Sequence, residues 1–75
     1  MDSHIKGIEF DTAGEAIQYT DASGTGVAIA VGGRWFVVEQ EEADRLAAAG
    51  VEFAYLVDHE MPDGSLRTVT IPVNG

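Results

Sequence analysis

The densest group of side chains able to bind a metal ion lies in one short segment near the C-terminus. It comprises Asp58, His59, Glu60 and Asp63. Carboxylate oxygens and an imidazole nitrogen are ligands for divalent cations, so this segment is a candidate site for a metal, a small ligand or the chemistry of a small enzyme. Against this, the spacing matches no calcium-loop or zinc motif, and neighbouring residues of an extended chain point alternately. We therefore expect a solvated hairpin loop, without a cofactor.

Two other groups lack the partners that catalysis or nucleotide binding requires. His4 and His59 are the only histidines, and neither has an evident nucleophile beside it. The Gly24-Thr25-Gly26 segment has no third glycine at the spacing of a dinucleotide-binding loop, and a strand is expected after it. We predict a flexible connection there and a protein that is not an enzyme.

A candidate interaction surface surrounds two adjacent aromatic residues. Trp35 and Phe36 lie in a predicted strand, so their side chains must point to opposite faces of a sheet. With only one helix expected, one ring packs beneath that helix, and the other is covered by the core or by another chain. The acidic residues Glu41, Glu42 and Asp44 follow closely. We predict that these five residues form a protein-interaction surface.

The charge of the chain is strongly negative and unevenly distributed. The chain has 13 acidic and 4 basic residues, and its formal net charge is −9. Eight of the acidic residues, with a single basic one, lie in residues 39–63. This composition argues against direct binding to nucleic acid or to an anionic membrane. The acidic segment either keeps the protein soluble or steers a basic protein partner.

The hydropathy pattern predicts an α+β fold. Strands are expected at residues 5–10, 16–20, 27–31, 34–38, 51–58 and 66–73, with a helix at residues 40–49. The order is β-β-β-β-α-β-β, with five to six mostly antiparallel strands and one short helix packed on one face of the sheet. Turn residues are expected at 11–14.

Local signals also predict how some strands pair. A Gly32-Gly33 turn suits a tight hairpin between residues 27–31 and 34–38. The twelve residues from 39 to 50 are about the minimum for a crossover between parallel strands that carries a helix. Pro72 cannot donate a hydrogen bond to a neighbouring strand, which predicts that the last strand lies at an edge of the sheet or ends there.

The length of 75 residues predicts a single domain, spanning residues 1–75, that is marginally stable alone. Cysteine is absent, so no disulfide can stabilise the fold, and association with another chain is a common alternative. We expect a cytoplasmic, non-enzymatic interaction module that forms a homo-oligomer or binds a basic protein. The rival hypothesis is a metal-binding or small-ligand-binding domain, or a small enzyme, that uses the loop at 58–63.

Overall fold

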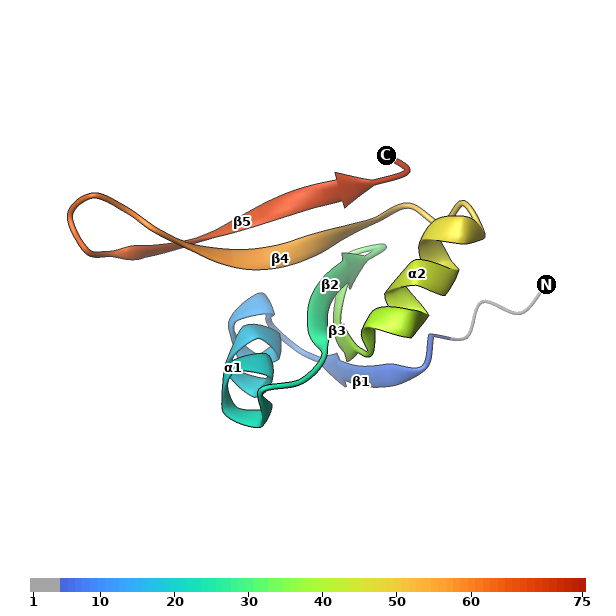
Figure 1. The fold of residues 1–75 in the computed structure, drawn as a ribbon, viewed down its shortest axis with the longest axis horizontal. Coiled ribbons are helices and arrows are strands. Elements are labelled where there is room, and N and C mark those ends of the chain that lie inside the picture. Colours follow the sequence, from blue (N-terminus) through green and yellow to red (C-terminus); the bar gives the residue numbers. More distant parts are fainter. Residues whose placement is uncertain (1–4) are drawn as a thin grey trace.

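Two helices and five strands make up the computed structural model, which describes residues 5–75 (Figure 1). In chain order they are β1 (Gly7–Phe10), α1 (Ala13–Ser23), β2 (Val27–Val31), β3 (Arg34–Val38), α2 (Gln40–Ala48), β4 (Phe53–Glu60) and β5 (Leu66–Val73). The strands form one sheet in the order β1-β3-β2-β4-β5, and every neighbouring pair is antiparallel. The predicted α+β class with a small antiparallel sheet is confirmed.

The hairpin of β2 and β3 forms the centre of the sheet, as the Gly-Gly signal predicts. Gly32 and Gly33 have φ values of 57° and 81°, which a tight two-residue turn requires and glycine adopts without a steric penalty. Ile29 therefore lies opposite Phe36, the register that a two-residue turn at Gly32-Gly33 requires. This hairpin supplies the buried side chains for both faces of the sheet.

Each helix connects two parallel strands that are separated by a third strand. β3 and β4 are both antiparallel to β2, so they run parallel to each other with β2 between them. The predicted crossover through α2 is therefore present, although it skips one strand. In the same way, α1 connects β1 to β2, and β3 lies between those two strands. β5 is an edge strand, as Pro72 predicts.

The strand predicted at residues 16–20 is wrong, because this segment belongs to helix α1 (Ala13–Ser23). The predicted turn at 11–14 leads directly into that helix. The Thr12 hydroxyl oxygen accepts a hydrogen bond from the backbone N–H of Glu15 at 3.2 Å, and the hydroxyl group lies 3.1 Å from the Glu15 carboxylate. This is the side-chain cap that starts a helix. Gly24 ends the helix in the left-handed conformation.

Removing this cap should lower the stability of the protein. We expect Thr12→Ala to reduce the free energy of unfolding by about 1 kcal/mol, since the first turn of α1 loses its side-chain acceptor. In a domain of this size the melting temperature should fall by about 4–8 °C. Thermal unfolding followed by circular dichroism measures this change. Thr25→Ala, at an exposed threonine outside the helix, serves as the control; equal losses in the two variants would contradict the capping role.

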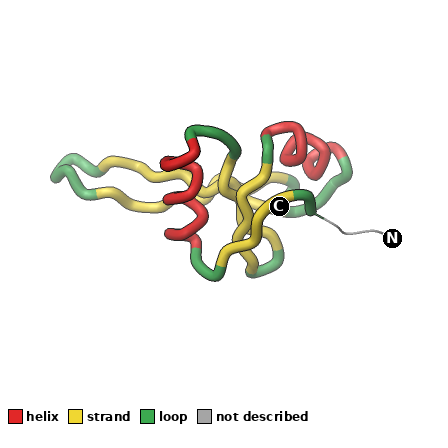
Figure 2. Tube along the Cα trace, turned by 90° about the horizontal axis from the view of Figure 1, so that it is seen from below, coloured by secondary structure: helices red, strands yellow, loops and turns green. Residues whose placement is uncertain are grey.

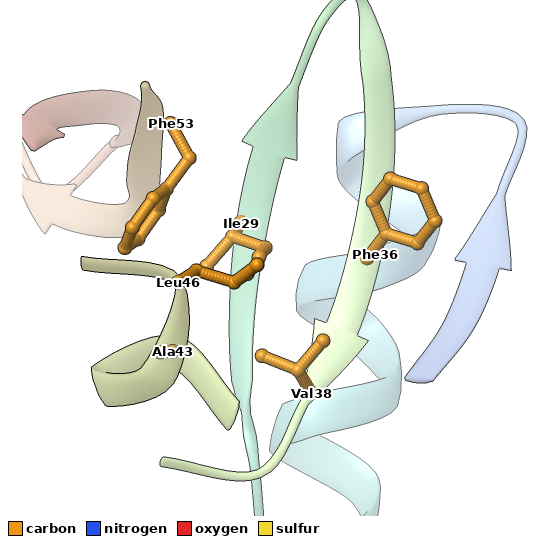
Figure 3. Packing of buried hydrophobic residues seen from close by; sticks show 6 residues of the cluster. All are labelled: Ile29, Phe36, Val38, Ala43, Leu46 and Phe53. Carbon is orange, nitrogen blue, oxygen red and sulfur yellow. The ribbon is translucent and has the colours of Figure 1, made fainter. Parts of the chain in front are cut away.

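The two helices cover opposite faces of the central hairpin (Figures 1 and 2). The α2 face contains the buried residues Ile29, Phe36, Val38, Ala43, Leu46 and Phe53 (Figure 3). The α1 face contains Ala16, Ile17, Ala28, Val37 and Leu56. The prediction of one helix on one face is therefore wrong, and the chain itself covers the second face. Neither helix in residues 5–75 is long and apolar enough to cross a membrane.

Candidate interaction surface

The two aromatic residues of the predicted surface belong to the core. Phe36 is 9% exposed and lies in the α2-face cluster, whereas Trp35 is half-buried and packs against the α1-face cluster. The prediction that they point to opposite faces is correct, and the cluster against which Trp35 packs includes Ala16 and Ile17 of α1. The two rings therefore do not form a joint exposed surface.

Glu42 is a buried carboxylate that two elements hold in place. Its oxygens accept hydrogen bonds from Arg45 Nε at 2.8 Å and Arg45 Nη2 at 2.6 Å, and from the backbone N–H of Lys6 at 3.0 Å. The Arg45 guanidinium, helped by the Lys6 amide, lowers the pKa of Glu42 from 4.5 to about 2. Glu42 thus links α2 to the start of β1, which is a structural role that the sequence spacing did not reveal.

The other two acidic residues of the predicted surface, Glu41 and Asp44, lie exposed on α2. The Asp44 carboxylate accepts a hydrogen bond from the Gln40 side-chain amide at 3.0 Å, and that amide also lies 3.2 Å from the Tyr55 hydroxyl. The five predicted residues are therefore distributed over two core clusters, one buried ion pair and one exposed helix surface. The fold does not bring them together at one site.

The loop at 58–63 does not bring its possible metal ligands together. Asp58 and His59 are consecutive in β4 and lie opposite Thr68 and Arg67, so their side chains leave opposite faces of the hairpin. The Asp63 carboxylate accepts hydrogen bonds from the hydroxyl and backbone N–H of Ser65, which lower its pKa. Within residues 5–75, no three side chains of His, Asp or Glu are grouped so that they could hold a metal ion.

A hollow of about 670 Å³ lies between β1, the end of β3 and the start of α2. Its charged lining residues are Lys6, Glu39, Glu41, Glu42 and Arg45. Glu42 and Arg45 neutralise each other, and the remaining charges are of both signs. The charged side chains that line the hollow therefore do not form a cluster of one sign that could recognise a charged small molecule.

The β4–β5 hairpin extends well beyond the sheet, and we call its outer part, residues 57–70, the arm (Figure 1). β4 pairs with β2 only through Tyr55 and Ala54, whereas it pairs with β5 along its whole length. Beyond Leu56 the ribbon thus consists of two strands. The molecule is accordingly elongated, with extents of 45 × 25 × 20 Å.

One face of the hairpin carries an exposed apolar row, which we call the arm stripe: Val57, Val69 and Ile71. Val57 and Val69 lie directly opposite each other, and Ile71 lies opposite Tyr55. Their exposed fractions are 42%, 37% and 51%, respectively. On the same face, Tyr55 contacts the buried Phe53 ring edge-on, with ring centroids 5.4 Å apart. The arm stripe is therefore an exposed continuation of the α2-face core.

The sequence contained a partial signal for the arm stripe. Alternating apolar residues at 51–57 predicted a strand with one apolar face, and Val69 and Ile71 alternate in the same way. No sequence pattern indicated that β2 would stop pairing with β4 after two residues. The exposure of the stripe therefore follows from strand lengths and sheet order, which are tertiary properties.

Comparison with protein-family models, curated proteins and solved structures finds no match for this chain.

Proposed function

We propose that this chain is a small, non-enzymatic protein–protein interaction module whose contact surface is the arm. The observation that carries this proposal is the arm stripe, where Val57 and Val69 are exposed on a ribbon that protrudes from the sheet and Ile71 is exposed at its base. A two-stranded ribbon is only marginally stable in water unless a third strand or an apolar surface packs against it. A protein partner would supply that surface.

The energetic gain from covering the arm stripe is appreciable for a chain of this size. Complete burial of one Val or Ile side chain is worth about 1.5–3 kcal/mol. The three residues of the stripe are each between 37% and 51% exposed. A substantial part of this burial free energy would therefore be gained when a partner covers them. Association would also add packing contacts to the ribbon and thus add to the stability of a domain without disulfides.

The alternatives have less support. A metal or ligand site at residues 58–63 would need ligands that converge, and Asp58 and His59 leave opposite faces. A basic protein partner would need unpaired acidic groups on α2, and Glu42 is already paired with Arg45. Glu41 and Asp44 could still steer a basic partner, and such binding would weaken steeply with salt. A cytoplasmic location is also proposed, from the composition alone, and cell fractionation tests it.

Site-specific photo-crosslinking tests whether the arm contacts a protein. A photoreactive side chain at Val69 should give cross-linked species of higher mass, with purified protein or in extract of the source cells. The matched control is Ile8, which is 45% exposed on the opposite edge strand β1. We expect strong cross-linking at position 69 that survives high salt, and weak cross-linking at position 8. Equal yields at both positions would refute the arm as the contact surface.

A further inference from the structure

We propose that the partner of the arm is a second copy of this chain, and that the two β5 strands pair antiparallel about a twofold axis at Thr70. This inference rests on the proposed function, since it names the partner of the same arm. The identity of the partner that binds the arm follows from three properties of β5: the backbone groups on its free edge, its charge and the position of its apolar side chains.

The free edge of β5 presents backbone groups that are ready to pair. The backbone N–H of Met61 donates to the Ser65 carbonyl at 2.7 Å, which makes this facing pair a hydrogen-bonded one. Hydrogen-bonded and non-hydrogen-bonded pairs alternate along an antiparallel ladder. Leu66, Thr68 and Thr70 therefore direct their backbone groups away from β4, toward the side where residues 5–75 supply no further strand.

The β5 edge is also the part of this acidic chain where two copies can approach with little repulsion. Residues 64–75 contain Arg67 and no acidic residue, although the net charge of the chain is −9. The other edge of the arm carries Asp58 and Glu60, and pairing two copies there would bring carboxylates together. An edge without acidic groups offers little attraction to a strongly basic peptide, and it can accept a strand with few charges. β5 is itself such a strand, since Arg67 is its one charged residue.

The register about Thr70 joins the two arm stripes. With Thr70 opposite Thr70 of the second copy, Val69 lies opposite Ile71 of the second copy, and the reverse pair forms across the axis. The exposed side chains of both arms then make one continuous apolar row, and the threonines form a favourable cross-strand pair. Pro72 lacks an N–H, but its carbonyl can still accept from Thr68 of the second copy.

The same register gives Arg67 a complementary environment. Arg67 would lie opposite Val73 of the second copy, beside the C-terminal end of that copy's α2. Within one chain, the Asn74 side-chain amide, next to Val73, donates to the carbonyl oxygens of Ala47 at 2.9 Å and Val51 at 3.2 Å. The Ala47 carbonyl lies in the last turn of α2, at the negative end of the helix dipole, which favours a nearby cation.

A charge-swap experiment at position 70 tests the partner and the register together. Light scattering after size-exclusion chromatography should show wild-type protein at twice the 8.0 kDa chain mass across the micromolar range. Thr70→Glu and Thr70→Lys should each raise the dimer Kd about tenfold or more, because like charges then face each other at the axis. An equal mixture of the two variants should restore the dimer. Glu and Lys substitutions at the exposed Thr25 are the matched control and should not change the dimer.

Proline substitutions provide a second test on the same arm. Thr70→Pro removes an outward N–H of β5 and should abolish the dimer, whereas Asp58→Pro removes an outward N–H of the opposite edge and should leave it intact. A monomeric wild type, or a dimer that survives every change at Thr70, overturns this inference. If the wild type is monomeric while position 69 still cross-links to another protein, the inference fails and the proposed function stands.

Discussion

Ile29→Ala should reduce the free energy of unfolding by about 2–5 kcal/mol, the largest loss that we expect from a single substitution. Ile29 has no exposed surface and lies on β2, the middle strand of the sheet. Phe36, Leu46 and Phe53 belong to the same cluster, so truncation leaves a cavity bounded by both β3 and α2 (Figure 3). A 75-residue domain has about 4–11 kcal/mol of stability in total, so a large part would be lost.

Urea unfolding followed by tryptophan fluorescence measures this loss through the shift in the unfolding midpoint. Ile8→Ala is the matched control, because Ile8 is 45% exposed on the edge strand β1. This control should cost well under half as much as the change at position 29. Similar midpoint shifts for the two variants would show that the α2-face cluster is not the main source of stability.

Lowering the pH from about 5 to 2 should remove about 2 kcal/mol of stability that Glu42 supplies. Its pKa is 4.5 in the unfolded chain and about 2 in the folded protein, so the unfolded state binds more protons in this range. The stabilisation is therefore complete above pH 4.5 and disappears as the pH falls through about 2. The full pKa difference corresponds to about 3 kcal/mol, and water screening at the Arg45 side chain, which is 53% exposed, lowers the net contribution of the ion pair.

Chemical unfolding at several pH values checks this prediction when wild type and Glu42→Gln are compared. The stability of the variant should depend less on pH between 5 and 2, because its amide does not titrate. Glu41→Gln, at an exposed position on the same helix, controls for the general effect of removing one negative charge. If wild type and Glu42→Gln respond to acid equally, the ion pair is not the source of the acid sensitivity.

Helix α1, which the sequence did not predict, removes the original reason for expecting self-association. The sequence predicts a strand at residues 16–20 and a single helix, which would leave one apolar face of the sheet without a helix from the same chain. α1 covers that face with Ala16 and Ile17, both of which are buried. Self-association nevertheless remains a prediction, and its support now comes from the arm stripe rather than from an uncovered core.

The Thr12-x-x-Glu15 spacing is a capping signal for this helix, and it overlaps the turn signal of residues 11–14. An Asp-Thr-Ala-Gly segment is typical of a turn, and Ala16 to Thr20 contains too few apolar residues to establish a helical period. The cap becomes decisive only when the apolar side of α1 has a sheet to pack against. Short helices depend on such packing for most of their stability.

Local sequence signals specify the features that depend on neighbouring residues. Gly32-Gly33 specified the central hairpin and its register, the apolar spacing of Ala43 and Leu46 specified α2, and Pro72 placed the last strand at an edge. These signals act over a few residues through backbone conformation, side-chain period and hydrogen-bonding capacity. They can therefore be read without knowledge of distant contacts.

Tertiary structure alone decided which side chains are buried, paired or exposed. Glu42 is held by Lys6, 36 residues away, and Trp35 packs against a cluster that includes buried residues of α1, a helix expected to be a strand. Val57 and Val69 lie beyond the central strands because β2 pairs with β4 through only two residues, Ala54 and Tyr55. Such outcomes depend on sheet order and strand length, which arise from long-range packing and which no local pattern specifies.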